Sequence, residues 1–224
     1  MPTKASKFKK VIQQVLTPQL QELGYINTSP LSWAKDKNTT EPYIFSIQIT
    51  PYFNQGEEGY CYLEAGAHLS FIPPAHLEGK SPKDEVIETI DSMFRKRLIN
   101  KLNDRDDFVC GNDEEGMHLM TDYLFEAVKH EATEYFMNFD PGVFPVPFVS
   151  ITTEDINQKT AYTKLFVEPA IMIALHLSRI HLYLKDQQKA NEFVNYGLSL
   201  VEGKRGSGLI PHFENIKTGD LYLP

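Results

Sequence analysis

The chain has 224 residues, of which 42% are hydrophobic and 23% are charged, and its formal net charge is −8. This length and composition are typical of a soluble globular domain and exclude collagen-like and disordered classes. The longest apolar run, 169–184, contains His176, Arg179 and His181. It is too short and too polar to span a bilayer, so we expect no membrane partner.

The N-terminal segment and the two cysteines indicate the compartment. The start is basic, but Gln13 and Gln14 interrupt its apolar run and no small-residue cleavage site follows. We therefore expect no targeting segment. Cys61 and Cys110 do not suggest a disulfide framework, and reduced thiols are expected. These features predict a cytoplasmic protein.

The first predicted element is a helix over residues 6–23, whose apolar side chains recur at helical spacing. Thr17 and Pro18 interrupt this pattern, because threonine can cap a helix and proline suits a first helical position. We expect a kink or two short helices there, with the helix ending at Gly24.

An antiparallel meander is predicted next. Residues 43–50 alternate with period two, and a second strand is expected over 60–71, with 54–59 as the hairpin loop. A shorter strand around 31–34 precedes them. The side chains expected to share one face of the first long strand are Tyr43, Phe45, Ile47 and Ile49.

The stretch PPAHLEGKSPKDEV, residues 73–86, superficially matches a phosphate-binding loop. Such a loop needs a glycine five positions before Gly79, because successive backbone N–H groups must surround the phosphate. Pro74 occupies that position and has no N–H group. Nucleotide binding therefore remains only a further alternative, and we interpret Ser81 as the cap of a helix that follows.

That helix is expected to run to about residue 101. Asp84 and Glu85 lie in its first turn and several basic residues in its last, which complements the helix dipole. Its predicted buried stripe consists of Ile87, Ile90, Phe94 and Leu98.

The second half of the chain reads as mainly helical. A helix is expected over 117–138, an extended loop over 141–147 and a short helix over 153–166. Residues 170–184 and 187–202 predict a helical hairpin that is similar to one tetratricopeptide repeat unit. A single such unit cannot bury both of its faces, so we expect it to pack on the rest of the protein.

Together these elements predict an α+β fold, with a small antiparallel sheet packed by helices and followed by a helical lobe ending in a helical hairpin. We interpret residues 1–224 as a single domain with two lobes. The sheet-bearing lobe covers 1–102 and the mainly helical lobe covers 103–224.

Charge is concentrated in one segment. Ten of the 30 acidic residues and two of the 22 basic residues lie between 103 and 134, which gives this segment a net charge of −8 and leaves the rest of the chain neutral. Such a segment repels nucleic acids and anionic membranes and favours a basic protein partner. The candidate partner-binding residues are Asp104, Asp106, Asp107, Asp113, Glu114 and Glu115. No structural partner is predicted for the last three.

A second pattern offers a metal site as an alternative. His118, Asp122, Glu126 and His130 recur every four residues, continued by Glu134, so they share one face of a helix. The opposite face is an apolar stripe, which favours an ordinary solvated helix surface. This stripe consists of Met117, Met120, Leu124, Val128 and Tyr135. We therefore predict no metal and no cofactor, and keep a metal-dependent enzyme as the alternative.

No catalytic set emerges from the remaining polar residues. His176, Arg179 and His181 fall in a helix that is apolar nearly all round, so we expect them to be buried with hydrogen-bonding partners. Cys61 lies in a strand pattern and is predicted to be core. Cys110 lies among acids, which suppress the thiolate.

Residues 6–70 resemble a family of uncharacterised bacterial α+β proteins described only as a domain of unknown function. The residues that carry the resemblance are Phe8, Ile12, Leu16, Pro18, Leu20, Gly24, Tyr25, Trp33, Ile47, Gln48, Leu63, Gly66 and Ala67. The resemblance implies no catalytic residues. By analogy with small proteins of this kind, it implies an immunity-like partner of a toxin. The leading hypothesis is a cytoplasmic, non-enzymatic protein-interaction module.

Overall fold

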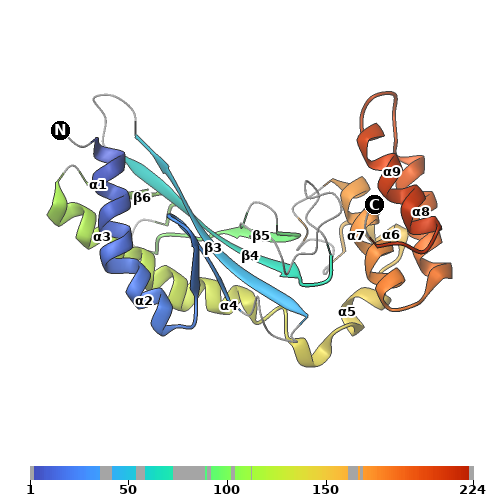
Figure 1. Cartoon of the computed structure of the whole chain (residues 1–224), viewed down its shortest axis with the longest axis horizontal. Coiled ribbons are helices and arrows are strands. Elements are labelled where there is room, and N and C mark those ends of the chain that lie inside the picture. The colour runs from blue at the N-terminus through green and yellow to red at the C-terminus, as the bar shows by residue number, and fades with distance from the viewer. Residues whose placement is uncertain are drawn as a thin grey trace. The chain divides into compact units, whose positions relative to one another are not determined.

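A computed structural model describes residues 3–35, 42–53, 59–72, 89, 92–101, 104–111, 113–160, 166 and 169–221. The chain forms two compact units (Figure 1). The first unit contains Met1–Ala67 and Val86–Phe139, and the second contains His68–Glu85 and Asp140–Pro224. The predicted α+β class is confirmed. The units differ from the expected lobes, because 103–139 belongs with the sheet-bearing unit.

One antiparallel sheet runs in the order β1-β2-β3-β4-β5, and β6 also pairs with β4. The strands are β1 (Ile26–Ser29), β2 (Ser32–Lys35), β3 (Tyr43–Tyr52), β4 (Tyr60–Leu69), β5 (Phe94–Arg97) and β6 (Phe108–Val109). The long strands predicted over 43–50 and 60–71 are confirmed as β3 and β4. The loop predicted over 54–59 lies outside the described residues except for Gly59.

The helix predicted to run to residue 101 was wrong over its last turns, because Phe94–Arg97 is strand β5. Arg95 pairs with Gly66 and Lys96 with Ala65 of β4, whose edge supplies the hydrogen-bond partners. Phe94 is buried, with its ring centroid 4.8 Å from that of Phe139. Of the earlier part of the predicted helix only residues 89, 92 and 93 are described, and the loop 73–86 lies outside the described residues.

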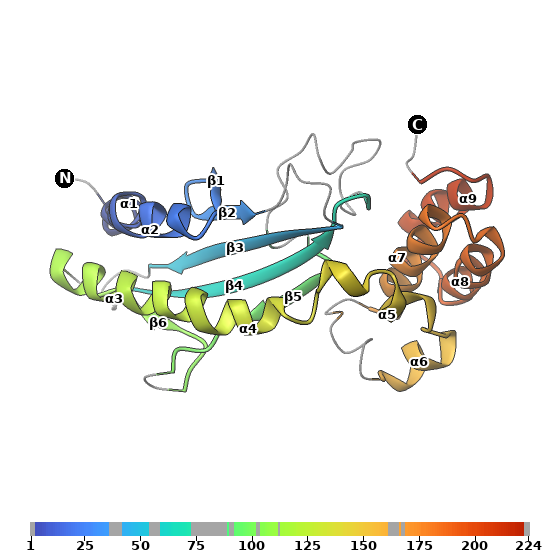
Figure 2. The same cartoon turned by 90° about the horizontal axis from the view of Figure 1, so that it is seen from below.

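Two helical segments lie beside the sheet (Figure 2). The first consists of α1 (Lys4–Val11), a π-helical turn η1 (Ile12–Leu16) and α2 (Thr17–Glu22). The second, here called the long helix, consists of α3 (Glu114–Ala127), a π-helical turn η3 (Val128–Ala132) and α4 (Thr133–Phe136). The interruption predicted at Thr17 coincides with the end of η1, and Gly24 has a positive φ of 88° just beyond α2.

Aromatic contacts join both helical segments to the same sheet face. Trp33 of β2 is fully buried, and its indole N–H donates to Thr17 Oγ1 at 3.3 Å. The Phe45 ring of β3 lies 4.6 Å from that of Phe136 in α4. Trp33 pairs with Ile47 of β3, which places Trp33, Phe45 and Ile47 on one face, as the period-two pattern predicts.

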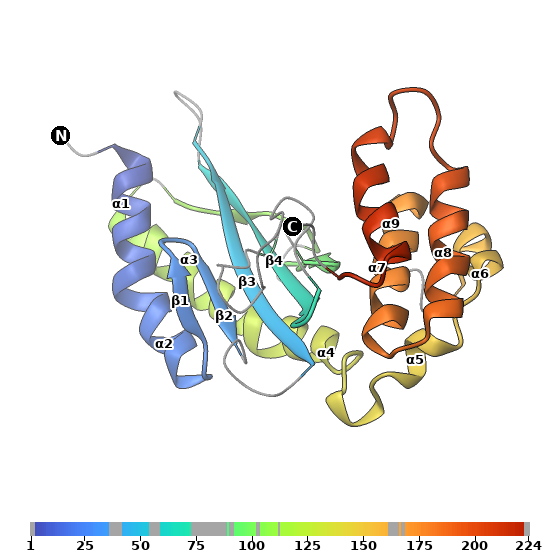
Figure 3. The ribbon, with the colours of Figure 1, turned by 45° about the vertical axis from the view of Figure 1, so that its right-hand side comes forward.

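The second unit is helical (Figure 3). Its elements are η4 (Pro141–Val143), α5 (Val146–Val149), α6 (Thr153–Gln158), α7 (Ala170–Tyr183), α8 (Gln187–Ser199), η6 (Ser207–Leu209) and α9 (Ile210–Lys217). The predicted hairpin is confirmed as α7 and α8. The predicted helix 153–166 is shorter, because Lys159 adopts the left-handed conformation that ends α6.

Helix α9 covers the hairpin and had no counterpart in the predicted elements. Its buried side chains, Phe213 and Ile216, pack into one cluster with residues of both hairpin helices. Those residues are Ala174, Leu175, Ala190 and Val194. The hairpin therefore packs against the C-terminal helix α9. None of the helices within the described residues is long and apolar enough to cross a membrane.

Candidate functional site

The predicted partner-binding acids begin in the loop between β5 and β6. Asp104 is exposed and has a positive φ of 54°. Asp106 Oδ2 lies 3.0 Å from Arg97 Nη1, and Asp107 is buried and paired with Arg105. The hydrogen bond that Arg97 donates to Asp106 is the main cause that raises the pKa of Arg97. Two of these three acids are therefore engaged by arginines within the protein.

Asp113, by contrast, has a structural role, which corrects the expectation that it has no structural partner. Its Oδ1 accepts the Gly116 N–H at 2.8 Å and so caps the long helix, which starts three residues earlier than predicted. Glu114 and Glu115 occupy the first turn, where carboxylates complement the helix dipole. Both remain exposed.

The outer side of the long helix carries the five residues of the proposed metal stripe, all of them exposed. His130 Nε2 lies 3.1 Å from Glu126 Oε2, which makes an ordinary helix-surface pair. His118 and His130 are separated by about 18 Å along the helix axis, at 1.5 Å per residue. Across the described part of the chain, no three or more His, Cys, Asp or Glu side chains gather to hold a metal. The opposite stripe, Met117 to Tyr135, is buried as predicted.

A line of carboxylates with one apolar residue remains at the surface of this helix. Glu115, Asp122 and Glu126 are spaced by seven and four residues, so they lie along one side. Leu119 lies on the same side between Glu115 and Asp122 and is 52% exposed. Glu115 and Asp122 form no ion pair with any described residue. We call Glu115, Leu119, Asp122 and Glu126 the acidic face.

Glu131 is a buried carboxylate whose pairing with two lysines was not predicted from the sequence. Its side chain is only 10% exposed, with Oε1 at 3.0 Å from Lys101 Nζ and Oε2 at 3.8 Å from Lys96 Nζ. A surface cavity of about 350 Å³ lies beside it, lined in part by Tyr123 and His130. Glu131 follows Leu124 by seven residues and Val128 by three, so its spacing alone placed it beside the apolar stripe.

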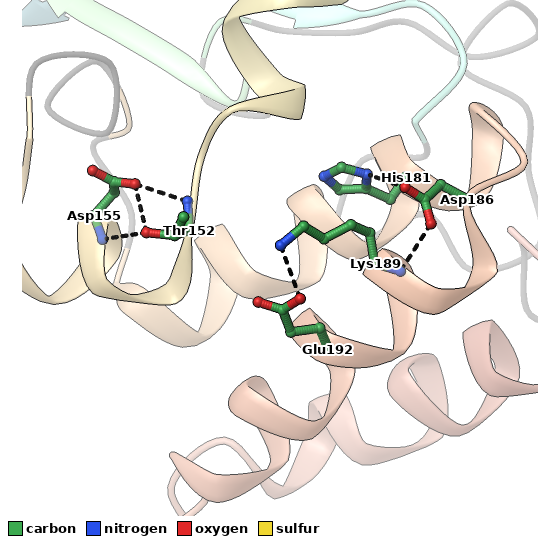
Figure 4. Close-up of polar contacts among 6 residues, drawn as sticks. All are labelled: Thr152, Asp155, His181, Asp186, Lys189 and Glu192. Atoms are coloured by element: carbon green, nitrogen blue, oxygen red, sulfur yellow. Dashed lines mark hydrogen bonds and ion pairs between the residues drawn. The ribbon is translucent and has the colours of Figure 1, made fainter.

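The second unit buries the polar residues of α7, as predicted, but the expected hydrogen-bonding partners are found only in part, because neither ring nitrogen of His181 has one among the described residues. Arg179 Nη2 lies 3.2 Å from His212 Nδ1 of α9. His181 is 1% exposed, and its ring stacks on that of Phe193 at 5.4 Å. Figure 4 shows Asp186 beside it, with Oδ2 at 3.8 Å from His181 Nδ1, while Oδ1 accepts the Lys189 N–H and caps α8.

The His181 ring should make stability sensitive to pH. Burial lowers its pKa, and this outweighs the opposing effect of Asp186. The folded state therefore binds fewer protons than the unfolded state, whose histidine pKa is about 6.5. Stability should be full above that value and should fall as pH drops below it. Thermal unfolding measured across this pH range should show a smaller loss of stability for His181→Phe than for the wild type. The exposed-site control, His118→Gln, should match the wild type, and equal losses in all three would contradict this role.

No family model matches this chain, and no curated protein or solved structure matches it either.

Proposed function

We propose that the protein is a non-enzymatic interaction module that binds a basic protein partner through the acidic face. The observation that carries this proposal is Leu119, an exposed apolar side chain flanked by the carboxylates of Glu115 and Asp122. Interfaces commonly combine an apolar centre with a charged rim, and the rim charges steer the approach of the partner.

We keep only part of the predicted set of partner-binding residues in this proposal. Asp106 and Asp107 are engaged by arginines, and Asp113 is engaged by the helix backbone, so these three carboxylates are less available to a partner. Asp104, Glu114 and Glu115 remain exposed and stay in the set. They are joined by Asp122 and by Glu126, which is exposed although it also pairs with Lys129 and His130. An immunity-like role and a cytoplasmic location are parts of the same proposal.

The test compares the wild type with a triple variant, Glu115→Gln, Asp122→Asn and Glu126→Gln, in pull-downs from native lysate. We expect the wild type to retain a basic protein at low salt and to lose it at high salt, because the screening length falls from about 10 Å at 0.1 M to about 3 Å at 1 M. The triple variant should associate more slowly with this basic protein, and its association should depend less on the salt concentration.

A matched control changes the net charge equally at other exposed sites, through Glu22→Gln, Glu202→Gln and Glu214→Gln. This control should retain the partner as the wild type does, and Leu119→Ala should weaken retention mainly by faster dissociation. Retention of the same proteins by all forms at both salt concentrations would eliminate the acidic face as the binding site.

A further inference from the structure

The two cysteines of the chain are distant in sequence, but the sheet brings them to one place. Cys61 of β4 pairs with Phe108 of β6, and the Cys110 N–H donates to the Gly59 carbonyl at 2.7 Å, which extends this register. Because Phe108 and Cys110 are two residues apart, both point to the same side as Cys61. Cys110 is thus the diagonal cross-strand neighbour of Cys61, and both are 0% exposed.

The sulfur atoms lie in an apolar, sulfur-rich environment. The Cys61 thiol contacts Met120 Sδ at 3.6 Å, and the Cys110 thiol contacts the Phe108 carbonyl at 3.8 Å. The pKa of Cys61 is raised mainly by the side-chain interaction with the Cys110 thiol, and burial is the second cause. The Cys61 thiol is therefore held in its protonated form at neutral pH.

We propose that Cys61 and Cys110 form a reversible intramolecular disulfide, which makes this pair an oxidation site. The oxidant is a small disulfide of the glutathione class. The thiolate of one cysteine attacks the S–S bond, forms a mixed disulfide and releases one thiol. The second cysteine then attacks the protein sulfur of that mixed disulfide and releases the second thiol. The protein loses two protons and two electrons, and the small disulfide is reduced to two thiols.

The geometry favours reversibility over a permanent crosslink. Diagonal neighbours in an antiparallel pair have Cα atoms about 7–8 Å apart, whereas disulfides usually need about 4.4–6.8 Å. The short strand β6 must therefore shift toward β4 when the bond forms. A bond closed against such a shift is more easily reduced than a structural one. This inference does not depend on the proposed function.

The experiment equilibrates the full-length protein in a fixed mixture of reduced and oxidised glutathione, both in native buffer and in concentrated urea. To reach equilibrium despite burial, the native samples are refolded from urea into the same mixture. Free thiols are then alkylated under denaturing conditions, and intact mass and peptide mapping identify the products. We expect a monomer 2 Da lighter than the dithiol, with a Cys61–Cys110 linked peptide that disappears on reduction.

The ratio of disulfide to dithiol should be at least about tenfold higher in native buffer than in urea, because the fold holds the thiols together. An equal or lower ratio in native buffer would overturn the proposal, as would glutathione adducts on both cysteines or a disulfide-linked dimer. The variants Cys61→Ser and Cys110→Ser should show no 2 Da loss. Their thermal transitions report separately whether each substitution disturbs the fold.

Discussion

Replacing Phe213 with alanine is expected to lower the free energy of unfolding of the second unit by about 3–5 kcal/mol. The side chain is fully buried and packs against both helices of the α7–α8 hairpin through the cluster that contains Leu175 and Val194. Its removal would leave a cavity between three helices. Urea denaturation followed by circular dichroism should show the loss as a lower midpoint. An unchanged midpoint would show that α9 does not contribute to the core of this unit.

A complementary pair of glycine variants tests the same packing from the other side. A Cβ atom added at Gly197 would lie 2.3 Å from Phe213 Cζ, whereas one added at Gly208 would meet no atom within 4 Å. Gly197→Ala should therefore be destabilising by about 1–3 kcal/mol through overpacking, even though alanine favours a helix by about 1 kcal/mol. Gly208→Ala should be nearly neutral. Similar effects at both positions would contradict the close approach of α8 and α9.

The elements that could be predicted were those whose residues carry the signal themselves. The alternation from Tyr43 to Ile49 identifies β3, and the all-round apolar character of α7 identifies a buried helix. In these cases local spacing and local structure agree.

The misassigned elements depend on contacts that are distant in sequence. The segment Phe94–Arg97 has basic residues typical of a helix end, but the free edge of β4 makes it a strand. Helix α9 contains Pro211 close to its start, and a hydrophobic surface on the hairpin stabilises it. Cys61 and Cys110 become neighbours only through the register between β4 and β6. The sequence around either cysteine carries no information about that register.

Trp33 provides the corresponding test in the first unit. Trp33→Ala is expected to lower the free energy of unfolding by about 3–5 kcal/mol. The indole is fully buried on the sheet face covered by the helical segments, and its strand is held in register by the pairing of Trp33 with Ile47. The loss should appear as a lower urea midpoint in the transition that includes the sheet.

Trp33→Phe separates packing from hydrogen bonding at this site. Phenylalanine retains most of the buried apolar surface but removes the N–H group that donates to Thr17 Oγ1 at 3.3 Å. The lost hydrogen bond contributes about 0.5–1.5 kcal/mol, so this variant should lie much closer to the wild type than Trp33→Ala does. Thr17→Val then removes the acceptor, and the double variant with Trp33→Phe should lose little more than either single variant. Strictly additive losses would show that the indole and the hydroxyl do not interact, and that packing alone holds β2 against α2.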